Sequence, residues 1–325
     1  MLHRGMVPRM NEQAPPHEKL AALVAACAGI PAVATAVVHP CDPPSLTGAL
    51  QAASAGLIVP ILVGPVARIR KVAAEAGLEL AGIRLEDTPH SHASADAGVA
   101  LVRAGAAQAL MKGSLHTDEL MGAVVARDTG IRTARRISHV YVMDVPTYGK
   151  LLFITDAAVN IFPTLDDKVD IAANAIELAQ ALGIPAPKVA ILSAVETVSA
   201  KIPSTIDAAA LCKMSERGQI TGGILDGPLA FDNAINLEAA RTKGIVSPVA
   251  GDADILLVPD LEAGNMLAKT LTFLGRADAG GLVLGARVPV ILTSRADSVH
   301  ARLASCAVAA LYSHTRLQRP VLAAD

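Results

Sequence analysis

The fold of this chain is constrained most by an alternation of short apolar runs with alanine-rich stretches along most of its 325 residues. Runs rich in Val, Ile and Leu predict strands at 33–38, 57–63, 82–85, 108–111, 188–192, 222–225, 255–258, 281–284 and 288–292. Helices are predicted between them at 66–76, 92–104, 166–182, 204–217, 232–242, 261–274 and 298–311. Because uniformly apolar strands joined by helices are typical of parallel sheets, the pattern predicts an α/β fold with a mostly parallel sheet covered on both faces.

The alternation is interrupted once, where two strand-like runs follow each other without a helix. They are residues 137–145 and 151–155, joined by the turn sequence 146–150, a pattern typical of a hairpin. The residues before it, 127–136, are polar and rich in arginine. We therefore predict a domain boundary near Arg136, and we expect residues 1–15 to form a disordered leader.

The composition excludes several classes of protein. Hydrophobic residues make up 52% of the chain, enough for real cores. Aromatic residues make up 2%, Trp is absent and the net charge is -2, so neither stacking platforms nor a basic face for nucleic acid is expected. The four cysteines lie far apart, which indicates free thiols in a cytoplasmic protein rather than disulfides or a zinc site.

The segment from Leu20 to Val38 carries no charge and contains Ala-x-Ala triplets, so it resembles a signal peptide or a membrane span. It is broken by Gly29-Ile30-Pro31. A helix over about residues 18–28, a turn and a strand over 32–38 explain the same residues and fit the pattern that follows. We favour that interpretation and expect no membrane association.

The last predicted strand runs into the polar sequence Thr293-Ser294-Arg295-Ala296-Asp297-Ser298. In parallel sheets, ligands bind at the carboxyl ends of the strands. Arg295 suits phosphate or carboxylate, Ser294 offers a hydroxyl beside it, and Asp297 is able to accept a proton. The alternative is a helix N-cap with a solvated arginine. These residues alone do not decide between the two.

A second candidate site is the sequence Leu110 to Thr117, which predicts a strand end, a glycine and a helix start. Gly113 permits close backbone approach, the helix start offers free amides, and Lys112 adds positive charge, which together favour phosphate. His116 and Thr117 complete this candidate. It is not a P-loop. The competing interpretation is a turn capped by Thr117 with a solvated lysine.

Other polar turns follow predicted strands. His90 and His92 lack a third metal ligand, so capping or ligand contact is a better interpretation than a metal site. Asp226-Gly227-Pro228 and Pro259-Asp260, the latter followed by Asn265, are expected on the same sheet edge, facing a common crevice. The sequence lacks G-x-S-x-G, G-x-G-x-x-G and H-E-x-x-H motifs. Ser294 is therefore not expected to be an acyl-enzyme nucleophile.

The sequence 291–298 resembles the C-terminal signature of the phosphotransacylases, the phosphate acetyltransferase and phosphate butyryltransferase family. The likeness extends in order from about Ala32 to the end. The other segments that carry it are 110–117, 137–140, 155–160, 203–208, 226–229 and 254–265.

The resemblance implies two α/β domains with a cleft between them, similar to the isocitrate and isopropylmalate dehydrogenases. Domain I would comprise residues 16–136 and 292–325, and domain II would be inserted as residues 137–291. The implied reaction moves a short acyl group, acetyl or butyryl, reversibly between CoA and phosphate by direct thiolate attack on the acyl phosphate. It needs no metal and no cofactor besides CoA as a substrate. A homodimer is also expected from the family.

Residue roles follow from the resemblance. Ser294 matches the donor that stabilises the tetrahedral oxyanion, and Arg295 matches the residue that grips phosphate. We add Lys112, Gly113, His116 and Thr117 as candidates for the phosphate or acyl end. The matching segments make Asn160, Asp226, Pro228 and Asn265 candidates for CoA binding or for the cleft.

The chain departs from the family pattern at two places. Acetyl enzymes typically carry an aspartate, proposed as the base, seven residues after the serine, where this chain has Ala301. They also carry an arginine in the helix after the glycine turn, where this chain has residues 120–123, Leu-Met-Gly-Ala. Both departures favour the butyryl branch or relatives fused to hydratase domains. Asp297 becomes a candidate base, unless CoA enters as the thiolate without one.

Two alternatives are kept. A metal- and NAD(P)-dependent decarboxylating dehydrogenase of the same fold needs clustered aspartates, whereas Asp252, Asp254 and Asp260 are dispersed. A non-catalytic acyl-CoA- or phosphate-binding relative is compatible with Ala301.

Overall fold

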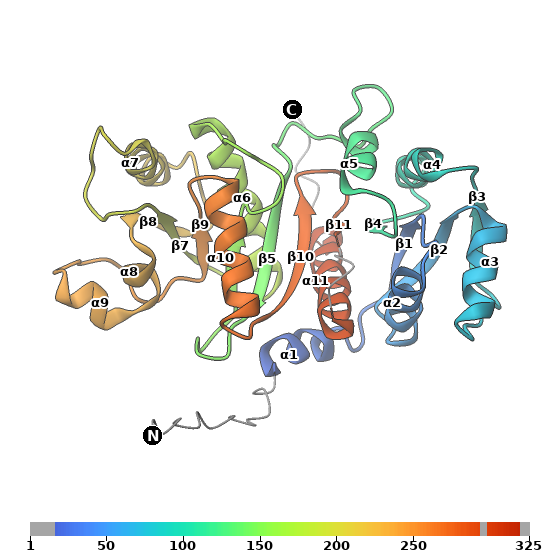
Figure 1. Cartoon of the computed structure of the whole chain (residues 1–325). Coiled ribbons are helices and arrows are strands. Elements are labelled where there is room, and N and C mark those ends of the chain that lie inside the picture. Colours follow the sequence, from blue (N-terminus) through green and yellow to red (C-terminus); the bar gives the residue numbers. More distant parts are fainter. Residues whose placement is uncertain (1–16, 293–297, 319–325) are drawn as a thin grey trace, which may run out of the picture.

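The computed structural model describes residues 17–292 and 298–318. Its centre is an 11-stranded sheet with the order β3-β2-β1-β4-β11-β10-β5-β6-β9-β7-β8 (Figure 1). The strands are β1 Val33–Val38, β2 Ile58–Gly64, β3 Arg84–Asp87, β4 Ala109–Lys112, β5 Ser138–Asp144, β6 Leu152–Thr155, β7 Lys188–Leu192, β8 Ile224–Leu229, β9 Ile255–Leu257, β10 Asp278–Leu284 and β11 Val290–Ile291. The predicted α/β class is confirmed.

Helices separate most of the strands. They are α1 Glu18–Ala26, α2 Pro43–Ser54, α3 Val66–Glu75, α4 Ser91–Arg103, α5 Thr117–Val125, α6 Leu165–Ala181, α7 Pro203–Glu216, α8 Phe231–Ile235, α9 Leu237–Thr242, α10 Leu261–Phe273 and α11 Val299–Gln318. The apolar segment near the N-terminus forms α1 and β1, as predicted. No helix within residues 17–292 and 298–318 is both long and apolar enough to span a bilayer.

The sheet is parallel within each end and antiparallel in the middle. β2, β1, β4 and β11 pair in parallel, and so do β6, β9, β7 and β8. Between these groups, β10 is antiparallel to β11 and β5, and the predicted hairpin β5–β6 is confirmed. The two parallel groups therefore run in opposite directions, so their carboxyl ends lie at opposite edges of the sheet. The prediction that all the polar turns share one edge is wrong.

Three hydrophobic clusters cover the two faces of the sheet. One cluster lies along one face of the sheet and packs it against α1, α2, α3, α6, α7 and α11. The opposite face has two separate clusters, one with α4 and α5 and the other with α8, α9 and α10. Figure 1 shows these two helix groups over opposite ends of the sheet. Helices thus cover both faces, as predicted, and the division of domains at residues 136 and 292 stays a prediction.

Candidate functional site

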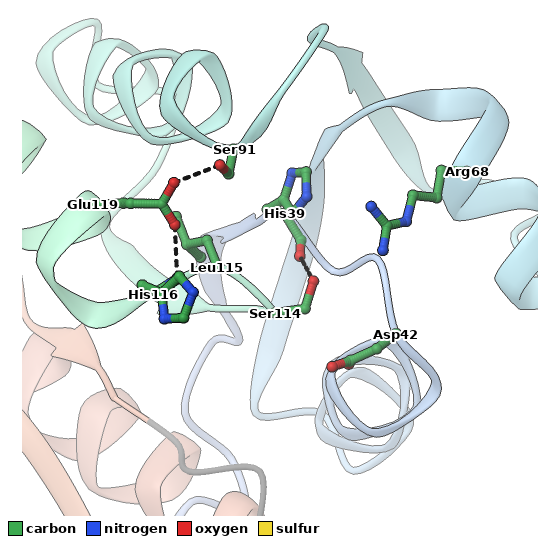
Figure 2. Close-up of a pocket in the computed structure, with 8 residues that line it drawn as sticks. All are labelled: His39, Asp42, Arg68, Ser91, Ser114, Leu115, His116 and Glu119. Atoms are coloured by element: carbon green, nitrogen blue, oxygen red, sulfur yellow. Dashed lines mark hydrogen bonds between the residues drawn. The ribbon is translucent and has the colours of Figure 1, made fainter.

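A polar pocket of about 280 Å³ opens at the carboxyl ends of β1, β2 and β4, where α2, α3, α4 and α5 begin (Figure 2). Its lining residues are His39, Asp42, Arg68, Ser91, Ser114, Leu115, His116 and Glu119. The size suits a small anion with a short acyl chain better than a whole nucleotide. Among the described lining residues, Leu115 is the only one with an aliphatic side chain, so polar contacts dominate.

Gly113 is the point where the β4–α5 turn meets the end of β1. A Cβ built on Gly113 would lie 2.4 Å from the carbonyl oxygen of Val38 and 2.5 Å from that of His39. The Gly113 amide donates to Val38 O at 2.8 Å, and the Ser114 amide donates to His39 O at 2.9 Å. Only glycine permits this approach, so the predicted role of Gly113 in close backbone packing is supported. The contact, however, is made by its own backbone with β1.

His39 follows β1 directly and has the left-handed backbone conformation, with φ +56°. Its amide donates to Val63 O, and its carbonyl accepts from the amide of Cys41 and from the Ser114 hydroxyl. A residue other than glycine in this conformation is uncommon and needs support from its surroundings. These bonds provide that support, so the backbone of His39 is fixed from β2 and from the β4–α5 turn.

The imidazole of His39 is fixed as well. Nδ1 lies 3.0 Å from Ser94 Oγ, and Ser94 Oγ donates to the carbonyl of His90 at 2.9 Å. Thr88 Oγ1 lies 2.8 Å from Ser94 Oγ. Burial, then the positive charge of Arg68, lowers the pKa of His39, so the ring is neutral near pH 7.

Glu119, in the first turn of α5, is held by donors around it. Its carboxylate accepts from the Ser91 hydroxyl at 2.5 Å and from the His116 amide at 2.8 Å, and it pairs with His92 Nδ1 at 3.1 Å. The Ser91 hydrogen bond, followed by that of the His116 backbone, lowers the pKa of Glu119. Glu119 is therefore an anchored anion and a poor proton acceptor.

The predicted phosphate residues do not all reach the pocket. His116 lines it, and Gly113 shapes the turn beneath it. Lys112 is 8% exposed, and its ammonium donates to Gly113 O at 3.2 Å, so it is not a solvated lysine. Thr117 is the first residue of α5 and is exposed, while His116 takes the N-cap position that the competing interpretation gave to Thr117.

Sequence reasoning missed His39, Asp42 and Arg68. Asp42 caps α2 by accepting from the Ser45 amide. Arg68 lies in the first turn of α3 and, within the described part of the chain, forms no hydrogen bond or ion pair. Figure 2 shows its guanidinium directed toward His39. Their positions in the sequence could have identified them, because His39 and Arg68 each follow a predicted strand closely, where ligand-binding residues are expected.

The predicted catalytic residues Ser294, Arg295 and Asp297 lie outside the described residues. The structure does describe the residues on either side of this segment, up to Leu292 and from Ser298. β11 pairs in parallel with β4, with Ile291 opposite Met111, so Leu292 leaves the sheet beside Lys112. Ala301 lies in the first turn of α11, is 6% exposed, and provides no proton acceptor in its side chain.

Asn160 and Asn265 both hold the loop after β6. Asn160 is buried, and its amide group donates to Ile137 O and to Asp156, while its Oδ1 accepts from Arg136 Nε at 2.7 Å. Asn265, on α10, donates to Ala157 O at 3.2 Å. These contacts fix the position of that loop.

Asp226 and Pro228 lie inside β8, not in a turn after a strand, because β8 continues to Leu229. That part of the prediction is wrong. β8 is the last strand of the sheet, far from β4 in the strand order. The assignment of these two residues and of the two asparagines to CoA binding stays a prediction.

Within residues 17–292 and 298–318, no group of three or more His, Cys, Asp or Glu side chains is arranged to hold a metal ion. His90 and His92 make other contacts. The His90 ring accepts from the Ala93 amide as the N-cap of α4, and His92 pairs with Glu119. The prediction of capping for this pair is confirmed for His90.

Comparison with known proteins identifies the family. The sequence model described as "Phosphate acetyl/butaryl transferase" matches residues 91–310. A phosphate acetyltransferase of Rhizobium meliloti is 68% identical over 301 residues, which are 93% of this chain and 95% of that protein. A phosphate butyryltransferase of Clostridium acetobutylicum is 43% identical over 279 residues, 86% of this chain and 92% of that protein.

A solved structure agrees with the sequence matches. A branched-chain phosphotransacylase from Enterococcus faecalis V583 superimposes with a TM-score of 0.75 at 32% identity, covering 86% of this chain and 99% of that one. The predicted resemblance is therefore confirmed, and the chain belongs to the phosphotransacylase family.

Proposed function

We propose that the protein transfers a short acyl group reversibly between CoA and inorganic phosphate. The parallel pairing of β11 with β4 carries the proposal, because it brings the chain entering the Ser294-Arg295 signature next to the Lys112–Gly113 turn. In an α/β sheet the carboxyl ends of neighbouring parallel strands are the usual place for a ligand. An enzyme of this class needs a phosphate subsite and an oxyanion donor at the same point.

The polar pocket supports the phosphate end of the reaction. Arg68 adds a fixed positive charge, and His116 and Ser114 add hydrogen-bonding groups. In the forward direction, the thiolate of CoA attacks the acyl carbonyl, the C–O bond to phosphate breaks, and phosphate leaves. We propose that Ser294 donates to the oxyanion and that Arg295 binds the departing phosphate. Asp297 remains a candidate base.

The acyl group that we propose first is acetyl. The 68% identical relative is a phosphate acetyltransferase although this chain has Ala301 at the expected base position, whereas the butyryltransferase is 43% identical. This comparison argues against butyryl as the acyl group, which the presence of Ala301 had favoured. The decarboxylating dehydrogenase is not favoured, and a binding protein without turnover is the second candidate that the assay below addresses.

We also propose a cytoplasmic homodimer with the two-domain, cleft-containing fold expected from the family. Exposed apolar side chains on and beside α10 support an interface: Ile161, Phe162, Met266, Phe273 and Leu274. Met266, Phe273 and Leu274 recur at helical spacing, and the Leu261 amide donates to Ile161 O at the start of α10. Light scattering should give twice the chain mass for the wild type and a smaller value for Met266→Lys/Phe273→Lys.

A donor panel tests the function. Purified protein is incubated with acetyl-, propionyl- or butyryl-CoA and phosphate, and the free thiol of CoA is followed. We expect phosphate-dependent thiol release with at least one donor, and a loss of roughly 10²-fold or more in Ser294→Ala and in Arg295→Ala. Absence of release from every donor by folded protein would refute the proposal, and the binding protein would then be favoured.

A further inference from the structure

The reaction needs a proton acceptor that the described chain does not supply at Ala301. The CoA thiol has an ordinary pKa of about 8.5, so near pH 7 most of it carries its proton. Two carboxylates among the described residues line the pocket: Asp42 caps α2, and Glu119 is held by three donors. Among the described lining residues, His39 is then the remaining buried titratable group.

We assign the protonated nitrogen of His39 from the hydrogen bonds around Ser94. Ser94 has one hydroxyl proton, and we assign it to the His90 carbonyl, which is able only to accept. Ser94 Oγ is therefore an acceptor toward His39, so Nδ1 carries the hydrogen and Nε2 carries the lone pair. Ser94 is fully buried, which turns Nδ1 away from solvent. No described residue hydrogen-bonds to Nε2, and we take Nε2 as the nitrogen available from the pocket.

The position of His39 fits a reacting group. β1 and β11 flank β4, with Val38 opposite Lys112 and Ile291 opposite Met111. The chain therefore leaves the sheet at His39 and at Leu292 on nearly the same level, two strand spacings or about 10 Å apart. This spacing leaves room for an acyl phosphate and the thiol end of CoA between the two strand ends.

Resting on the proposed function, we propose that His39, in place of Asp297, is the general base that accepts the thiol proton of CoA. The proton moves from sulfur to Nε2 as the S–C bond forms and the C–O bond to phosphate breaks. Phosphate leaves, and the imidazolium releases its proton to solvent. In the reverse direction the imidazolium protonates the departing thiolate. Thr88 and Ser94 orient the ring, and a left-handed backbone locked from both sides keeps it in place.

Burial, and then the charge of Arg68, lower the pKa of His39 and keep the ring neutral and ready to accept a proton. Arg68 on α3 faces it and opposes protonation, while the same charge favours a thiolate nearby. The other charged or titratable groups that act on the ring are Glu119 on α5, Asp42 before α2 and His90 before α4.

Two variants separate a base from a structural residue. His39→Gln keeps an acceptor near the place of Nε2 but accepts no proton. His39→Asn keeps the donor to Ser94 and tolerates the left-handed backbone. His314→Gln, whose ring bonds Gln318 near the end of α11, is the matched control. Turnover is measured with acyl phosphate and CoA from pH 6 to 9.5, and thermal unfolding checks that each variant is folded.

We expect both His39 variants to lose roughly 10²- to 10⁴-fold in kcat near pH 7. The loss should shrink to about tenfold or less at pH 9.5, because the thiol then ionises without help. A loss that is equal at every pH, or no loss, would overturn the proposal. If neither variant folds, the wild type decides, since its kcat must fall as the pH drops through a pKa below the usual 6.5 of histidine. Wild-type protein without turnover would refute the proposed function instead.

Discussion

The substitution Gly113→Ala is predicted to separate the β4–α5 turn from the end of β1. The new Cβ would lie 2.4 to 2.6 Å from the Val38 and His39 carbonyl groups, against 3.4 Å for ordinary contact, so the backbones must move apart by about 1 Å. Three hydrogen bonds of 2.8 to 2.9 Å cross this junction, from the Gly113 amide, the Ser114 amide and the Ser114 hydroxyl.

A displacement of that size breaks or weakens all three bonds. At about 0.5–1.5 kcal/mol for each of the three bonds, the free energy of unfolding should fall by about 1.5–4.5 kcal/mol. Activity should fall as well, because the same turn positions His116 and supports His39. Urea unfolding followed by circular dichroism measures the stability, and thiol release from acyl-CoA measures the activity.

Gly122→Ala is the matched control. Gly122 lies in α5, and a Cβ there would meet nothing within 4 Å. Alanine in a helix should stabilise the protein by about 0.5–1 kcal/mol and leave turnover unchanged. If Gly113→Ala were as stable and active as Gly122→Ala, the proposed close approach of the two strand ends would be refuted.

Three further predictions follow from the pocket and the thiols. Arg68→Gln should raise the KM for phosphate by roughly tenfold or more, because a charge-assisted contact is lost. Arg70 is exposed on the same helix, and Arg70→Gln should leave this KM unchanged. Equal KM values for the two variants would show that Arg68 does not bind phosphate. Because Ser91 and the His116 amide lower the pKa of Glu119, its stabilising contribution is present above about pH 4.5 and lost as the pH falls below it. Urea midpoints of the wild type and Glu119→Gln should therefore differ at pH 7 and converge as the pH falls well below 4.5, and a constant difference would contradict the assignment. Burial raises the pKa of Cys27 and Cys41 to about 11 and that of Cys306 to about 12, so these thiols should resist alkylation at pH 8 until urea is added; mass spectrometry of the native protein would expose fast labelling.

Local patterns predicted individual strands well, because the signal for each lies in its own residues. The bounds of β1 and β7 agree with the prediction, and the β5–β6 hairpin follows its turn sequence. β8 was predicted too short, because Asp226-Gly227-Pro228 is typical of a turn. β8 is an edge strand, however, and an edge strand tolerates proline, because the missing N–H costs no ladder hydrogen bond on the side without a neighbouring strand.

The arrangement of the strands decided the rest, and it depends on contacts distant in sequence. The antiparallel pairs of β10 and of β5–β6 reverse the direction of half the sheet, which removed Asp226 and Asn265 from the edge that holds Gly113. The pocket also needs His39, which follows β1, and Arg68, which lies in α3 after β2, and no local pattern reveals how close these two strands lie to β4. The Gly113 turn could be predicted because it is continuous in the chain, whereas the roles of the signature segment stay a prediction.

The most direct test of acyl transfer between CoA and phosphate is ³¹P NMR of the protein with acetyl-CoA and inorganic phosphate. We predict that an acyl phosphate signal grows as the phosphate signal declines, in proportion to the CoA thiol released, and that adding CoA reverses the change. If folded protein released thiol while the phosphate signal stayed constant, hydrolysis rather than transfer to phosphate would be the reaction, and the central claim would be wrong.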